Sequence, residues 1–213
     1  MQDAYMGARK PGDDTGAINA IDFLVRQRLS KMAGATLVQV KAVNGTGVNP
    51  VGFVDVQPLV FQIDGYGNLI PSVMQTNVPY FRLQGGQSAV ICDPAIGDIG
   101  LCIFARHDLS NVKATRAPAG PGSRRQHSWS DGLYLGGYLN GTPNEYIWMT
   151  GSGVKVKTAG AFEVDAAQAV FNCPVQVNGT INATDDVTGG SISLDNHTHT
   201  GVQPGSGSTG KPQ

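Results

Sequence analysis

The chain has 213 residues, 15% of them charged, and a formal net charge of −1. A nearly neutral chain has no overall electrostatic attraction for nucleic acid or for an anionic membrane surface. No apolar run approaches the roughly 18 residues of a membrane span. The N-terminus also lacks the apolar region of a signal peptide, so we expect synthesis and folding in the cytoplasm without export.

The composition favours short strands and tight turns over helices. Few residues are charged, and 29 are glycine. The three cysteines, Cys92, Cys102 and Cys173, are odd in number and show no C-x-x-C spacing. We therefore expect free thiols rather than a disulfide framework. The predicted fold class is mainly β.

Residues 1–33 are predicted to form a polar arm followed by one amphipathic helix. Either Asp14 or Thr15 is placed to cap its first turn. Large apolar side chains recur at helical spacing. They are Ile18, Ile21, Leu24, Val25, Leu29 and Met32. The stripe predicts packing on the helix's own domain or on a neighbouring copy, and the alternative is a docking helix for a partner.

Residues 34–115 carry the pattern of a small Greek-key barrel of the OB type. Partly alternating, β-branched segments predict about five strands, the second of them bent at Pro58. The predicted strands are 36–43, 51–63, 79–83, 88–92 and 100–106. Turn signals separate them at 44–47, 64–68 and 93–98. OB barrels often bind nucleic acid, but these strands carry few basic residues and no aromatic platform, so we do not expect that function.

Residues 116–150 are predicted to be a linker and an aromatic-rich junction. Arg124 and Arg125 precede a concentration of large aromatic side chains. These are Trp129, Tyr134, Tyr138, Tyr146 and Trp148. One interpretation is a sugar or phosphate site, and the other is a core or interchain contact next to the barrel. No Ser/His/Asp or Cys/His spacing indicates a nucleophile, so an enzyme is not expected.

Residues 151–196 alternate apolar and polar side chains in short segments separated by turn residues. The apolar set is Val154, Val156, Phe162, Val164, Ala166, Ala169, Phe171, Cys173, Val175, Val177, Ile181, Ala183, Ile192 and Leu194. Strands this short cannot form a core alone. Three intertwined copies would bring their apolar faces together on an axis, whereas a single-chain solenoid would have too few coils to stack.

Residues 197–213 begin with a pair of histidines. In an extended backbone His197 and His199 point to the same side. A closed zinc site needs about four ligands and an octahedral ion about six. The remaining ligands would come from Asp195, from water or from other copies. Three copies would supply six imidazoles, which indicates a trimer.

The chain resembles the central spike of Mu-like contractile-tailed phages, including the N-terminal OB domain of phage spikes. The resemblance rests on residues 35–40, 51–60, 78–86, 93–100 and 131–137 and on the His-Thr-His motif of 197–199. It implies a homotrimer with an OB collar, an intertwined trimeric β-helix and a pointed, metal-bound tip. It also implies one iron ion per trimer with six ligands, His197 and His199 of each chain. The residues alone do not choose iron over nickel, zinc or another divalent metal.

The resemblance further implies a structural component of the virion at the baseplate tip of the tail. Sheath contraction would drive this spike through the host outer envelope, with transient contact with the outer membrane. The expected partner is the tail baseplate hub protein, with no small-molecule substrate. The alternative is a tail adhesin that binds host surface glycan through the aromatic residues between 129 and 148. A cell-wall hydrolase is a third reading that no residue spacing supports.

Overall fold

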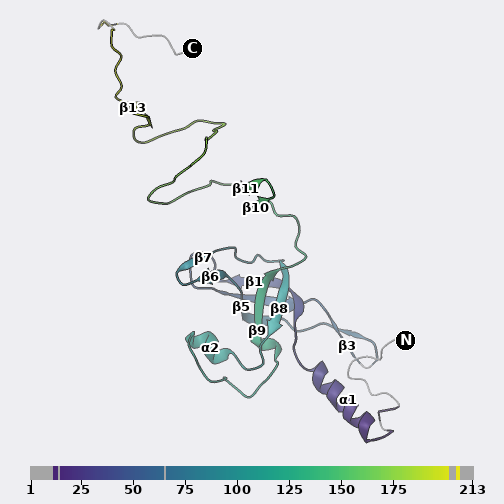
Figure 1. Cartoon of the computed structure of the whole chain (residues 1–213). Coiled ribbons are helices and arrows are strands. Elements are labelled where there is room, and N and C mark those ends of the chain that lie inside the picture. Colours follow the sequence, from purple (N-terminus) through teal and green to yellow (C-terminus); the bar gives the residue numbers. More distant parts are fainter. Residues whose placement is uncertain (1–11, 14, 65, 202–204, 207–213) are drawn as a thin grey trace. The chain divides into compact units, whose positions relative to one another are not determined.

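The computed structural model describes residues 12–13, 15–64, 66–201 and 205–206. The chain divides into two compact units, residues 1–157 and 158–213. The first unit holds one 14-residue helix near its N-terminus and a set of antiparallel strands, as Figure 1 shows. The predicted mainly β architecture is therefore confirmed.

Helix α1 (Ala17–Ser30) forms where the apolar periodicity predicts it, but its cap differs from the prediction. The N-cap is Gly16, and no side chain makes a capping hydrogen bond. The Thr15 hydroxyl instead donates to the Gly12 carbonyl, at 2.7 Å, and accepts from the side-chain amide of Asn19, at 2.9 Å. Asp14 lies outside the described residues.

The apolar stripe of α1 is not covered by the rest of the described chain. No residue of the helix is buried, and exposure along the stripe runs from 82% at Ile18 to 44% at Met32. The predicted packing of this helix on its own domain is therefore not observed. Of the predicted partners, a neighbouring copy and another protein stay open. Among the described residues, no helix combines the length and the apolar character needed to cross a membrane.

Five antiparallel strands form the main sheet, in the order β5-β2-β1-β8-β9. They are β1 (Thr36–Asn44), β2 (Phe53–Pro58), β5 (Gln75–Pro79), β8 (Ile99–Phe104) and β9 (Gly132–Gly137). Beyond the end of β5, Tyr80 makes a parallel bridge to Tyr134 of β9. Phe81 N–H donates to the Tyr134 carbonyl at 2.7 Å, so the two outer strands of the order contact each other.

The core of the first unit comes from alternate residues of these strands. Val40 of β1 lies opposite Val56 of β2, and both side chains are fully buried. The buried set is Val38, Val40, Val54, Val56, Val78, Tyr80, Cys102 and Tyr134. Gly100 of β8 lies under the Tyr134 ring, where a Cβ would collide with the phenol. The period-2 pattern of the sequence thus corresponds to one buried sheet face.

The strand predicted over 51–63 is wrong in its extent. Strand β2 ends at Pro58, and residues after it form a separate hairpin of β3 (Gln62–Ile63) and β4 (Leu69–Ile70). Proline has no N–H to donate, and beyond it the Leu59 N–H still donates to the Leu37 carbonyl of β1, at 3.0 Å, before the chain leaves the sheet. A second small hairpin pairs β6 (Leu83–Gly85) with β7 (Ser88–Val90).

The segment 116–150 contributes more to the first unit than a linker would. It supplies β9, the fifth strand of the main sheet, which pairs with β8. The chain between β8 and β9 contains α2 (Ser110–Thr115) and the 3-10 turn η1 (Trp129–Asp131). After β9, strands β10 (Tyr146–Thr150) and β11 (Gly153–Lys157) form a hairpin of their own.

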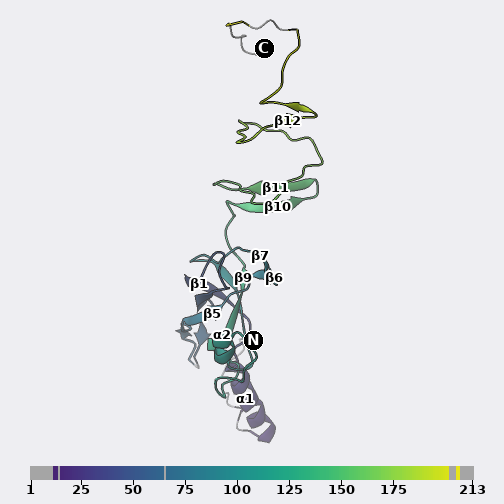
Figure 2. The same cartoon turned by 90° about the vertical axis from the view of Figure 1, so that its left-hand side faces the viewer.

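The second unit contains little regular structure within one chain (Figure 2). Its strands are β12 (Thr188–Gly189) and β13 (Ile192–Ser193), which pair with each other. Among the described residues from 158 to 187 no strand is assigned. Every described residue from 158 to 201 except Ser193 is exposed. The alternating apolar side chains of this segment therefore have no cover from their own chain.

Candidate metal-binding apex

The two tip histidines follow directly from the β12–β13 hairpin. Thr188 pairs with Ser193 and Gly189 with Ile192, and Gly190 makes the tight turn with a φ of 65°. Positive φ favours glycine, which explains Gly190 at this turn. Leu194 N–H then donates to the Val187 carbonyl at 2.9 Å, which extends the hairpin toward the histidines.

The structure brings the rings of His197 and His199 side by side. Their centroids are 5.1 Å apart, and the rings meet edge to face at 79°. Both residues are exposed. The pair is therefore accessible, with one residue between its members, as the period-2 argument expects for extended chain.

Hydrogen bonding fixes the tautomer of His197. Its Nδ1 lies 2.9 Å from the Ser193 carbonyl oxygen and 3.2 Å from that of Leu194. A carbonyl oxygen can only accept, so Nδ1 must carry the proton. In the neutral ring, Nε2 is then the nitrogen with a free lone pair. His197 is thus prepared to bind a metal through Nε2, with its other nitrogen held by backbone, as in many protein metal sites.

One chain does not complete a metal site in the part that the structure describes. Across residues 12–13, 15–64, 66–201 and 205–206, no group of three or more His, Cys, Asp or Glu side chains is arranged to hold an ion. Two imidazoles are fewer than the four donors of a closed zinc site or the six of an octahedral ion. Neutral imidazole nitrogen does suit iron, nickel and zinc, so the donor chemistry fits such a metal.

The aromatic residues between 129 and 148 do not gather into one cleft. Trp129 packs against Phe104 with ring centroids 4.8 Å apart, and Tyr134 is buried in the sheet core. On β10, Tyr146 and Trp148 meet edge to face at 6.5 Å. Tyr138 is half exposed. The core-contact interpretation therefore holds for Tyr134, and no shared sugar platform forms among these described side chains.

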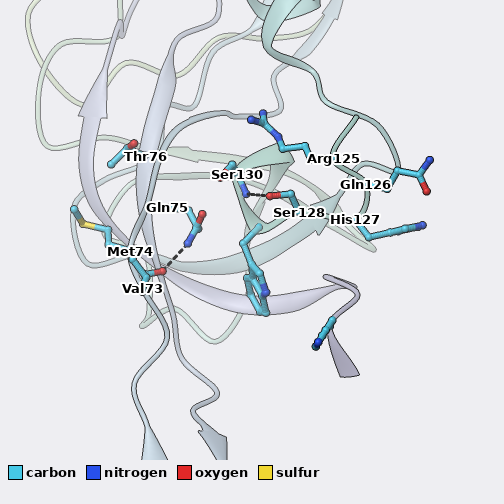
Figure 3. A pocket seen from close by; sticks show the side chains of 11 residues that line it. Val73, Met74, Gln75, Thr76, Arg125, Gln126, His127, Ser128 and Ser130 are labelled. Atoms are coloured by element: carbon cyan, nitrogen blue, oxygen red, sulfur yellow. Dashed lines mark hydrogen bonds between the residues drawn. The ribbon is translucent and has the colours of Figure 1, made fainter. Parts of the chain in front are cut away.

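An open cavity of about 700 Å³ lies beside Trp129 in the first unit. Figure 3 shows residues 73–76 along one side of it and Arg125, Gln126, His127, Ser128 and Ser130 along the other. Arg125 is engaged in structural ion pairs there. Its guanidinium donates to both oxygens of Asp131, at 2.8 and 2.9 Å, and to Asp108 at 2.8 Å. Arg125 therefore does not present an uncompensated positive charge to the cavity.

These ion pairs hold the long connection between β8 and β9. The Arg125 guanidinium is the main reason that the pKa of Asp131 lies below its usual value. Hydrogen bonds from Ser110 and Ser123, with a smaller effect of Arg125, lower the pKa of Asp108 to about 2. Sequence reasoning missed this cluster because its members are up to 23 residues apart and follow no periodic pattern.

Comparison with known families adds one finding at the C-terminal end of the chain. Residues 191–213 match the family model described as the GpV Apex motif. A search of curated proteins returned no match. The matched segment begins in the β12–β13 hairpin and contains both His197 and His199. The match indicates the tip of a phage spike and points to a structural protein of the virion tail rather than to an enzyme.

Proposed function

We propose that the chain is the central spike of a Mu-like contractile phage tail, which pierces the host outer envelope when the sheath contracts. The observation that carries the proposal is the apex motif, whose two histidines lie ring to ring at the end of a hairpin. In this function the chain is a virion component at the baseplate tip, and the tail hub protein contacts its OB-type unit.

The working form is a homotrimer. Exposure of the apolar side chains supports this, since Phe162 is 71% and Phe171 69% exposed in the single chain. A segment without a core does not offset the entropy lost when its backbone is ordered. Two further copies would supply both the strand partners and the apolar cover. The trimeric β-helix of residues 151–196 follows from this arrangement.

The metal would tie the three chain ends together at the axis. Six imidazoles, His197 and His199 from each of three chains, match the donor number of an octahedral ion, and we propose iron. When bound, the ion supplies a coordinate cross-link between chains. The chain itself supplies a His197 ring whose Nδ1 donates to the carbonyls of Ser193 and Leu194. A tip closed in this way resists splaying when force acts along the spike.

The test is the metal content and the mass of the purified full-length protein. We expect one metal ion per three chains by elemental analysis and a trimeric mass by light scattering. The double variant His197→Ala/His199→Ala should lose the metal and remain a trimer.

The matched control removes the two other histidines of the chain, His107→Ala/His127→Ala, and should keep the metal. A monomeric wild-type protein, or a metal ratio far from one to three, would contradict the proposal.

A further inference from the structure

The carboxylate of Asp186 accepts hydrogen bonds from residues of the apex hairpin. The Asp195 N–H donates to it at 3.1 Å. The Ser193 hydroxyl also donates to it, and this hydrogen bond is the main reason that the pKa of Asp186 lies below its usual value. Asp186, which precedes β12, is thus bonded to the β13 side of the hairpin, where Asp195 lies 9 residues along the chain.

Ser193 connects this carboxylate to the histidine. Its hydroxyl oxygen accepts from the Asn196 N–H at 2.8 Å, and its carbonyl accepts from His197 Nδ1 at 2.9 Å. Ser193 is also the one described residue between 158 and 201 that is partly buried. A continuous chain of contacts therefore runs from Asp186 through Ser193 to the His197 ring.

We propose that Asp186 is a positioning residue for the apex metal site. By fixing the Ser193 turn, it holds the carbonyls that retain the Nδ1 proton of His197 and so presents Nε2 to the metal. This inference rests on the proposed function for the metal, but its effect on the His197 tautomer stands without one.

The chemistry of the site requires a carboxylate at position 186. An ionised Asp only accepts, and the Asp186 carboxylate accepts from both the Asp195 N–H and the Ser193 hydroxyl. An Asn offers one acceptor oxygen, and its NH₂ group would meet N–H donors. Asp186→Asn therefore keeps the size of the side chain but loosens the turn.

The first measurement is the tautomer of His197 in the metal-free, full-length protein, read from imidazole ¹⁵N chemical shifts. The wild type should show the Nδ1–H form, and Asp186→Asn should show a mixture of both tautomers. Ser193→Ala, which keeps the carboxylate but removes the connecting hydroxyl, should give the same result. His107 and His127, in the first unit, provide reference signals that should not move. Asp165→Asn removes one carboxylate from the second unit outside the hairpin and is the matched control.

The second measurement is metal affinity, by competition of the full-length trimer with a chelator for Fe²⁺. Loss of a residue that orients a metal ligand typically weakens binding about 10- to 100-fold, and we expect that loss for Asp186→Asn relative to Asp165→Asn. If the wild type binds no metal, the proposed function fails, and the tautomer shift alone decides the inference. If Asp186→Asn keeps the His197 tautomer and binds Fe²⁺ within twofold of Asp165→Asn, the inference is overturned while the metal-bound tip stands.

Discussion

The main sheet of the first unit and the 158–201 segment of the second carry the same sequence signal with opposite outcomes. Both alternate apolar and polar residues. In the sheet, Val40 and Val56 are fully buried, whereas Phe162 and Phe171 are about 70% exposed. The difference does not lie in the apolar residues themselves but in where their neighbouring strands come from.

Strand β1 shows what the second segment lacks. It pairs with β2 on one side and with β8 on the other, so its backbone groups and its apolar face are both satisfied within one chain. Residues 158–187 have no such strand neighbour in the described chain. The first unit therefore has its own core, whereas the second does not bury its apolar side chains within one chain, which supports the proposed trimer.

The largest predicted effect comes from placing a charge on the apolar side of residues 158–201. Phe171→Asp would place three carboxylates near the proposed axis of the trimer. Burying an unpaired ion costs several kcal/mol, so we expect the trimeric β-helix not to assemble. Light scattering of the full-length variant should show loss of the trimer, while the first unit keeps its fold by circular dichroism.

Gln168→Asp is the matched control, because Gln168 belongs to the polar set of the same alternation. It should remain trimeric. A trimeric Phe171→Asp would mean that Phe171 does not face other copies and would remove the main support for the intertwined segment.

A second prediction concerns the first unit alone. Arg125→Met removes the ion pairs to Asp131 and Asp108 and leaves Asp131, whose side chain is fully buried, without its guanidinium partner. Breaking a buried pair costs about 3–5 kcal/mol, but Arg125 is 39% exposed, so water screens part of the interaction. We expect a loss of about 2 kcal/mol at pH 7 by urea unfolding, with the neighbouring Arg124→Met unchanged within about 0.5 kcal/mol.

The same variant has a defined pH dependence. The pKa of Asp131 is lowered in the folded protein, chiefly by Arg125, so its stabilising effect is complete above the ordinary value of 3.8 and is lost as the pH falls below that value. The destabilisation by Arg125→Met should therefore shrink as the pH is lowered from 4, because protonated Asp131 no longer needs the cation. An equal difference from the wild type at pH 7 and pH 3 would show that Arg125 acts through packing.

The sequence predicted the local features of the fold but not the pairing of strands that lie far apart in the chain. Period-2 alternation located β1, and glycines 45 and 47 marked the turn after it, where both have positive φ. Strand β9 was missed because three of its six residues, Gly132, Gly136 and Gly137, are glycine and because its partner β8 lies about 30 residues earlier. The local spacing of apolar residues does not predict which distant strand a segment pairs with.

At the apex, the placement of the two histidines could be predicted, but the contacts around them could not. Backbone period alone predicted that His197 and His199 share a side, and their rings do lie together. The contacts of Asp186 and Ser193 could not be predicted, because they depend on the hairpin closing and on backbone carbonyls that every residue type carries. The metal itself stays a prediction.

The smallest predicted effect tests how complete the core of the first unit is. The hydroxyl of Tyr134 is buried and has no hydrogen-bond partner among the described residues. Burial raises the pKa of Tyr134 to about 12, so at neutral pH the group is an unsatisfied O–H. Since a buried unpaired polar group costs about 1–3 kcal/mol, Tyr134→Phe should stabilise the unit by about 1 kcal/mol, measured by urea unfolding.

Tyr80→Phe is the control, and it should change the stability of the first unit in the opposite direction. The Tyr80 hydroxyl lies 2.8 Å from the Gly45 carbonyl and 2.7 Å from an Asp93 carboxylate oxygen, so its removal should destabilise the same unit by about 1–2 kcal/mol. Neither substitution should change the trimeric mass if the first unit folds on its own core. A loss of stability in Tyr134→Phe equal to that in Tyr80→Phe would show that the Tyr134 hydroxyl is satisfied in solution, and a change in mass would show that this core is coupled to assembly.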